Sequence, residues 1–203
     1  MTKKISKDWA GNIVFTCKEP MNLDDGDLPD EALVGNARSG DARSFEVLFD
    51  RYYDMIHAFA YRVCLVETEA DDIAQETFIR AARGLVGYRA TASFKNWLYR
   101  IAHNLTIDWG CRAARYQGRL TELAAGMESL PPRQPKNYDE VHGALRKLPP
   151  ELREAMALVY LDGMNHREAA AVMGCAETTV SWRIFRAKRA LRKLLTSTRG
   201  EWS

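Results

Sequence analysis

Apolar residues recur every three or four positions along most of this chain, and that spacing places them on one face of an α-helix. The strongest repeat follows Asp41, a suitable N-cap residue, and its apolar positions are Phe45, Leu48, Phe49, Tyr52, Ile56, Phe59 and Val63. A second repeat begins near Thr68 and contains Ile73, Ala74, Phe78 and Ala81. A third contains Phe94, Trp97, Leu98, Ile101, Ala102 and Leu105. From Leu28 onward, the first half of the chain is therefore predicted to be helical.

The segments between the repeats set the domain boundaries. Residues 1–26 show no sustained period and end in an acidic, turn-prone stretch, so we expect a mobile extension. Residues 116–138 contain two glycines and three prolines among polar residues, which favours a flexible linker. No alternating strand pattern of convincing length occurs. We therefore expect an all-α protein of two domains, 27–115 and 139–196, followed by a tail over 197–203.

The second domain has the pattern of a helix-turn-helix. Pro149 and Pro150 suit the first turn of a helix, where a missing N–H costs nothing. Asn165 and Glu168 have the spacing of a capping box, and Gly174 follows where the chain must turn tightly. The helix after this turn is predicted over residues 178–195, with core-facing positions at Val180, Ile184, Ala187, Leu191 and Leu194.

Net charge adds a functional contrast between segments. The whole chain carries only +2, but residues 67–76 carry −5, residues 95–119 carry +4 and residues 177–193 carry +5. The acidic segment suits a protein partner, and the basic segments suit the phosphates of nucleic acid. Each segment also has a plain structural explanation. Acids near a helix start are stabilised by the helix dipole, a basic helix face can simply be solvated, and the aromatic residues near 88–109 can pack in a core instead of stacking on bases.

No feature of the sequence indicates catalysis. The chain has no P-loop, no metal-binding cluster and no nucleophile–base pair, and its four histidines are scattered, as expected for surface or helix-cap roles. Its four widely spaced cysteines are expected to be reduced thiols in the cytoplasm. No apolar run approaches the roughly 20 residues of a membrane helix. We expect no enzyme activity, cofactor, metal, small-molecule substrate or membrane insertion.

Three motifs occur in a definite order. Asp71-Asp72-Ile73-Ala74-Gln75-Glu76-Thr77-Phe78 precedes Phe94-Lys95-Asn96-Trp97-Leu98-Tyr99-Arg100-Ile101-Ala102-His103-Asn104, and the helix-turn-helix follows the linker. In these motifs and their order, residues 28–195 resemble the extracytoplasmic-function sigma factors of the sigma-70 family. The resemblance implies a promoter-specificity subunit of bacterial RNA polymerase. The first domain would be sigma region 2, which docks on the clamp helices of the largest polymerase subunit and opens the −10 element, and the second would be region 4, which reads the −35 element.

The resemblance also assigns residues to these roles. It implies that core polymerase is bound by Asp71, Asp72, Gln75 and Glu76, with Phe78 in the core beneath them. The residues that it implies for binding the −10 element are Tyr88, Arg89, Ala90, Thr91, Ala92, Ser93, Lys95, Asn96, Arg100, Asn104, Asp108 and Arg112. The residues that it implies for binding the −35 element are Arg167, Glu177, Thr178, Thr179, Ser181, Trp182, Arg183, Phe185, Arg186, Lys188 and Arg189. An anti-sigma factor is a further partner that the family implies.

Two places depart from the family pattern and leave alternatives open. Thr178, Ser181 and Trp182 stand where small or basic residues are usual, and Trp182 is expected either to contact a thymine methyl or sugar or to pack on its own domain. The run Trp109-Gly110-Cys111 replaces a more basic one. Two other functions compete with the sigma factor: a stand-alone helix-turn-helix regulator, which would bind an operator without polymerase, and a helical interaction protein with a basic face.

Overall fold

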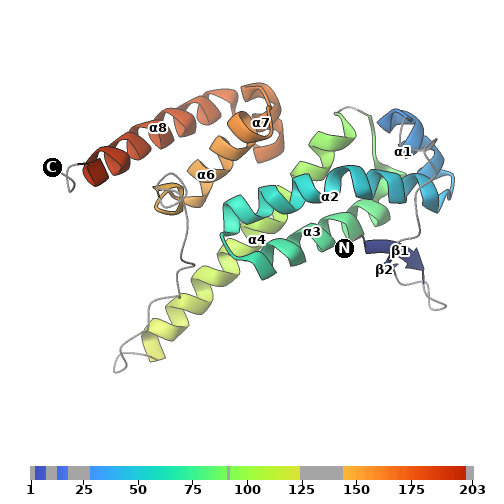
Figure 1. The fold of residues 1–203 in the computed structure, drawn as a ribbon, viewed down its shortest axis with the longest axis horizontal. Helices are drawn as coiled ribbons and strands as arrows, with labels where there is room; N and C mark the ends of the chain where they lie inside the picture. The colour runs from blue at the N-terminus through green and yellow to red at the C-terminus, as the bar shows by residue number, and fades with distance from the viewer. Residues whose placement is uncertain (1–2, 8–12, 18–27, 91, 124–143, 200–203) are drawn as a thin grey trace.

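The computed structural model describes residues 3–7, 13–17, 28–90, 92–123 and 144–199, with side chains over 28–90, 92–110 and 144–195. The helices form two groups that lie against one another, one from the first half of the chain and one from its last third (Figure 1). Among the described residues, no helix combines the length and the apolar character needed to span a bilayer.

The first group consists of α1 (Asp30–Arg38), α2 (Ala42–Cys64), α3 (Glu67–Gly84), the short 3-10 turn η2 (Leu85–Gly87) and α4 (Phe94–Leu123). Helices α2, α3 and α4 confirm the three predicted amphipathic helices. The predicted N-cap of α2 is also confirmed, because the Asp41 carboxylate accepts a hydrogen bond from the Arg43 backbone N–H at 3.0 Å. This cap satisfies one of the amide groups that a helix start leaves without a partner.

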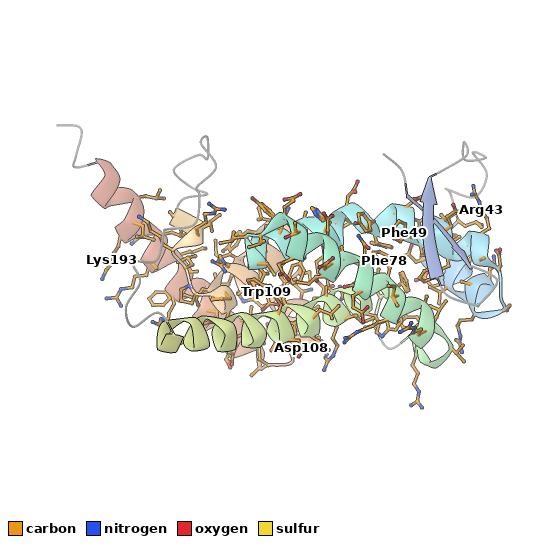
Figure 2. All side chains as sticks on the ribbon, turned by 90° about the horizontal axis from the view of Figure 1, so that it is seen from below. Arg43, Phe49, Phe78, Asp108, Trp109 and Lys193 are labelled. Carbon is orange, nitrogen blue, oxygen red and sulfur yellow. The ribbon has the colours of Figure 1, made fainter. Side chains whose placement is uncertain are left out.

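Aromatic side chains join α2, α3 and α4 into one core. Phe49 of α2 and Phe78 of α3 meet edge to face with ring centroids 4.8 Å apart, where these two helices face each other (Figure 2). Phe59 of α2 meets Tyr99 of α4 in the same way at 5.2 Å. Such pairs contribute about 0.5–1.5 kcal/mol beyond the area they bury. The predicted core position of Phe78 is confirmed, and it anchors α3 with the opposite, acidic face outward.

The second group consists of α6 (Pro150–Met156), the π-helical segment η3 (Ala157–Leu161), α7 (His166–Met173) and α8 (Glu177–Arg199). The predicted capping box is confirmed, since Asn165 Oδ1 accepts from the Glu168 N–H and Glu168 Oε2 accepts from the Asn165 N–H, each at 2.9 Å. Gly174 ends α7 with φ of +61°, a left-handed conformation that glycine adopts without a Cβ penalty. The helix-turn-helix over α7 and α8 is thus confirmed.

Residues 1–26 differ from the prediction that no strand occurs. The segment contains β1 (Lys3–Lys7) and β2 (Ile13–Cys17), which pair antiparallel with Ile5 opposite Phe15. The β-branched and aromatic residues of these five-residue strands favour extended chain, but the strands are too short for a clear alternation. The all-α prediction is confirmed for the two helical groups.

Helix α4 is longer than predicted. It continues to Leu123, past residue 116, where the sequence predicts the linker to begin. Gly118 is the reason that the prediction ends the helix too early, because one glycine among helix-forming residues costs only about 1 kcal/mol and does not stop a helix. The first proline after it is Pro131. The predicted linker residues 124–138 and the tail from residue 200 lie outside the described part of the chain.

The described thiols behave as expected from the sequence. Cys64 and Cys175 are free cysteines. Burial raises the pKa of the Cys64 thiol to about 12, so this group stays protonated and unreactive at neutral pH.

Candidate nucleic-acid and protein interface

An acidic surface lies on the outer face of α3. Asp72 is exposed, and one turn later the half-exposed Glu76 accepts a hydrogen bond from Arg80 Nε at 2.8 Å. Asp72, Gln75 and Glu76 line an open hollow of about 480 Å³, and the adjacent Asp71 carboxylate lies 3.4 Å from His57 Nε2. The structure therefore brings the four residues predicted for polymerase binding together on one helix. Carboxylates one turn apart on an outer face can meet the basic surface of a protein partner.

The loop between η2 and α4 is held in a defined shape. Tyr88 is buried, and its hydroxyl donates a hydrogen bond to the Ala92 carbonyl at 2.6 Å. Ser93 Oγ caps α4 by accepting from the Asn96 N–H at 3.2 Å. The loop and α1 enclose a second open hollow of about 480 Å³, whose lining includes Asp30, Glu31, Arg38, Tyr88, Ala90, Ala92 and Ser93. Arg89, Ala90, Ala92 and Ser93 are exposed, whereas Thr91 lies outside the described residues. The residues of α1 in this hollow have no counterpart in the sequence prediction.

The face of α4 predicted to contact the −10 element is partly covered by the second helical group. Lys95 Nζ donates to the Asp162 carbonyl at 3.1 Å, and Arg100 Nη1 donates to the Ala171 carbonyl at 2.5 Å. Asn104 and Asp108 are exposed, and Asn96 is half-buried. The side chain of Arg112 lies outside the described part of the chain. Two basic residues of this face, Lys95 and Arg100, are thus hydrogen-bonded to backbone carbonyls of the second group.

Further polar contacts fasten the two groups together. His103 of α4 pairs with Glu154 of α6, and both side chains are almost fully buried, at 8% and 6% exposure. Arg153 Nη2 donates to the Val63 carbonyl of α2 at 2.6 Å, and Arg62 Nη1 donates to Asp162 Oδ1 at 2.9 Å. The expectation that the histidines lie at surface or cap positions is wrong for His103. The sequence feature that indicates a buried His103 is the helical spacing of Tyr99, His103 and Thr106. All three are buried, so they broaden the buried face of α4.

Burial disfavours the charged forms of two residues at this contact, Asp162 and Arg153. Burial raises the pKa of the Asp162 carboxyl, and the neighbouring Arg62 and Lys95 offset only part of that shift. Burial likewise lowers the pKa of the Arg153 guanidinium. Both directions disfavour the charged forms, so these groups depend on their partners across the contact. Because the pKa of Asp162 is raised, this carboxyl favours the buried contact most when it is protonated, in acid. That stabilisation is lost as the pH rises through the raised pKa.

Helix α8 presents most of the residues predicted for the −35 element on its outer surface. Val180, Ile184 and Ala187 are buried as predicted, while Leu191 and Leu194 are half-buried. The exposed residues are Glu177, Thr178, Ser181, Trp182, Phe185, Arg186, Lys188 and Arg189, together with Arg167 on α7, and Thr179 is half-buried. Trp182 lies outside the core, 53% exposed, with the Arg186 guanidinium carbon 4.8 Å from its ring centroid.

Arg183 differs from its neighbours, because its side chain turns inward. Nη1 lies 3.7 Å from Met173 Sδ and 4.0 Å from Cys175 Sγ, and the residue is only half-exposed. We expect Arg183→Ala to lower the free energy of unfolding of the helix-turn-helix by about 1 kcal/mol, through lost packing of its stem. Chemical denaturation measures this change. A variant with unchanged stability but altered −35 base preference would contradict the inward position.

Comparison with known proteins decides the family. Residues 48–119 match the family model described as Sigma-70 region 2, and residues 138–191 match Sigma-70, region 4. The chain belongs to the extracytoplasmic-function sigma factors of the sigma-70 family. The RNA polymerase sigma-H factor of Pseudomonas aeruginosa is 34% identical over 180 residues, which cover 82% of this chain and 93% of that one. The ECF RNA polymerase sigma-E factor of Escherichia coli is 31% identical over 180 residues, covering 81% and 93%.

Solved structures agree with this assignment. CnrH in complex with the cytosolic domain of CnrY matches with a TM-score of 0.62 and 32% identity, covering 83% of this sigma factor and 97% of that chain. The sigma factor RpoE in complex with the anti-sigma factor NepR from Bartonella quintana matches with a TM-score of 0.60 and 26% identity, covering 76% and 98%. The sequence thus identified the family, but it missed the contacts between the two domains.

Proposed function

We propose that this sigma factor binds core bacterial RNA polymerase and directs it to a set of promoters. The observation that carries the proposal is the presence, on one chain, of an outward acidic surface on α3 and an exposed basic helix, α8. The acidic surface, with Asp71, Asp72, Gln75 and Glu76, takes the clamp helices of the largest subunit. The opposite charges suit two different partners, a protein and DNA.

The two domains divide promoter recognition. Region 2, proposed over residues 27–123, opens the −10 element with the loop from Tyr88 to Ser93 and the α4 face around Lys95, Arg100 and Asn104. Unpairing costs a few kcal/mol per step, and capture of an extruded base by the protein offsets part of that cost. Region 4, proposed over residues 139–196, places α8 in the major groove of the −35 element. The opening exchanges duplex contacts for single-strand contacts, so the protein performs no hydrolysis and is not an enzyme.

The contact between the domains gives this function a switch. Lys95 and Arg100 donate to carbonyls of region 4, so the −10 face is complete only after the domains separate. We propose that polymerase binding in the cytoplasm drives this separation. The related structures of CnrH and RpoE are complexes with the cytosolic domain of CnrY and with an anti-sigma factor, which supports an anti-sigma partner for this chain as well.

DNA binding with and without polymerase tests this proposal against a stand-alone regulator. We expect the isolated protein to bind promoter duplexes weakly and without sequence preference, because Lys95 and Arg100 of its −10 face are hydrogen-bonded to region 4. Adding core polymerase is expected to give sequence-specific complexes that resist competitor DNA. The measurement is fluorescence anisotropy with labelled genomic promoter fragments. Tight, specific binding by the protein alone would favour the regulator, and no specific signal in either arm would favour an interaction protein.

A further inference from the structure

Trp182 is the feature of the recognition helix that the proposed function leaves unexplained. Trp182 leaves 53% of its large, mostly apolar surface exposed to solvent, so packing within its own domain does not by itself explain a tryptophan at this position. It lies at the centre of the outward face of α8, whose other members at helical spacing are Thr178, Phe185, Arg186 and Arg189. The buried face of the same helix, with Val180, Ile184 and Ala187, is on the other side. Trp182 therefore sits where the helix would meet a major groove.

The Trp182 ring contacts the guanidinium of Arg186. One helical turn separates the two residues, and the guanidinium carbon lies 4.8 Å from the ring centroid. Because a free arginine side chain carries about 2 kcal/mol of rotamer entropy, a stacked guanidinium is already partly ordered before it meets DNA. Arg183 cannot take this role, since it is directed at the sulfur atoms of Met173 and Cys175.

A guanidinium that lies over an aromatic ring can keep the N–H groups at its edges free. Those edges match the O6 and N7 acceptors of a guanine in the major groove, which arginine contacts with two hydrogen bonds. Residues four apart on a helix are separated by about 6 Å along its axis, comparable to one or two base-pair steps. The exposed edge of the Trp182 ring is therefore within reach of a base pair near that guanine, where the thymine methyl is the apolar group available in the groove.

We propose that Trp182 is a positioning residue that fixes Arg186 for a guanine in the −35 element and contacts a thymine methyl one or two base pairs away. This inference rests on the proposed function and adds the base pairs that this region 4 selects. The ring acts through Arg186 on the guanine and directly on the thymine. Two readouts follow from it, the preference for guanine and the effect of removing a thymine methyl.

The experiment uses holoenzyme assembled from core polymerase and the full chain, which selects from promoter templates randomised across the −35 element. We expect wild-type holoenzyme to enrich guanine at one position and thymine one or two positions away, with guanine preferred over adenine on the order of 10-fold. Trp182→Leu is expected to lose most of that preference, and Trp182→Phe to keep most of it. Replacing the selected thymine by deoxyuridine is expected to weaken wild-type binding and to leave Trp182→Leu unaffected.

Tyr160→Leu is the matched control. It removes a second contact between a cation and an aromatic ring in region 4, because Lys188 Nζ lies 4.7 Å from the Tyr160 ring centroid, and it leaves Trp182 and Arg186 in place. The control is expected to keep the wild-type base preferences. Unchanged guanine and thymine preferences in Trp182→Leu would overturn the inference while leaving the proposed function standing. A holoenzyme that selects no promoter sequence at all would overturn both.

Discussion

Asp72→Lys combined with Glu76→Lys is expected to abolish binding to core RNA polymerase while leaving the helical fold intact. The double variant changes the charge of the acidic surface on α3 by four units, and both side chains lie on its outer face. Like charges placed across an interface cost several kcal/mol, which corresponds to a loss of affinity of at least about 100-fold. Surface plasmon resonance with immobilised core enzyme measures the affinity, and circular dichroism checks the fold.

The single variants separate the effect of the interface from that of the helix. Glu76→Lys also breaks the ion pair with Arg80, which costs about 0.3–0.5 kcal/mol of helix stability, whereas Asp72 forms no ion pair with any residue that the structure describes. Asp72→Lys alone should therefore weaken polymerase binding without a change in stability. Glu151→Lys reverses an exposed acid at the start of α6 in region 4 and serves as the control. Core affinity that survives the double variant would remove α3 from the interface.

Glu154→Ala is expected to release region 4 from region 2. It leaves His103 without its partner in a contact where both side chains are almost fully buried. Leaving a buried hydrogen-bonding group without its partner costs about 1–3 kcal/mol, so the equilibrium between closed and open arrangements should shift on the order of 10- to 100-fold toward the open one. Small-angle X-ray scattering measures the change as a larger radius of gyration. The open variant should also bind single-stranded −10 DNA more tightly, because Lys95 and Arg100 are freed.

Glu151→Ala is the matched control for this prediction. It removes a carboxylate of the same type from the same helix, but Glu151 is exposed and lies in the first turn of α6. Its radius of gyration should equal that of the wild type. Equal values for Glu154→Ala and the wild type, with helical content retained, would show that the buried pair does not hold the domains together.

The features that the sequence predicted well are local ones. The N-cap at Asp41, the capping box at Asn165 and the turn at Gly174 each depend on residues only a few positions apart. The helix-turn-helix and the acidic face of α3 follow from the same short-range rules. Most residues predicted for the −35 element lie on the outer surface of α8, although the side chain of Arg183 points into its domain and not outward.

Spacing patterns over a few residues did not predict the contacts between segments that are far apart in the sequence. Arg62 and Asp162 are 100 residues apart, and His103 and Glu154 are 51 apart. No spacing pattern pairs such residues, because the pairing depends on how the two domains pack together around a shared core. The sequence therefore predicted two DNA-binding domains but not that Lys95 and Arg100 donate hydrogen bonds to backbone carbonyls of region 4. The same limit explains why α1 was not connected with the loop at Tyr88.

Transcription reconstituted from purified components tests the central claim most directly. Core RNA polymerase, the wild-type protein or the Asp72→Lys/Glu76→Lys variant, and a library of genomic promoter fragments are combined, and the transcripts are sequenced from their 5′ ends. The account predicts defined start sites that require both core polymerase and the wild-type protein, preceded by shared −35 and −10 sequences. Start sites that are the same without the protein, or unchanged with the variant, would contradict it.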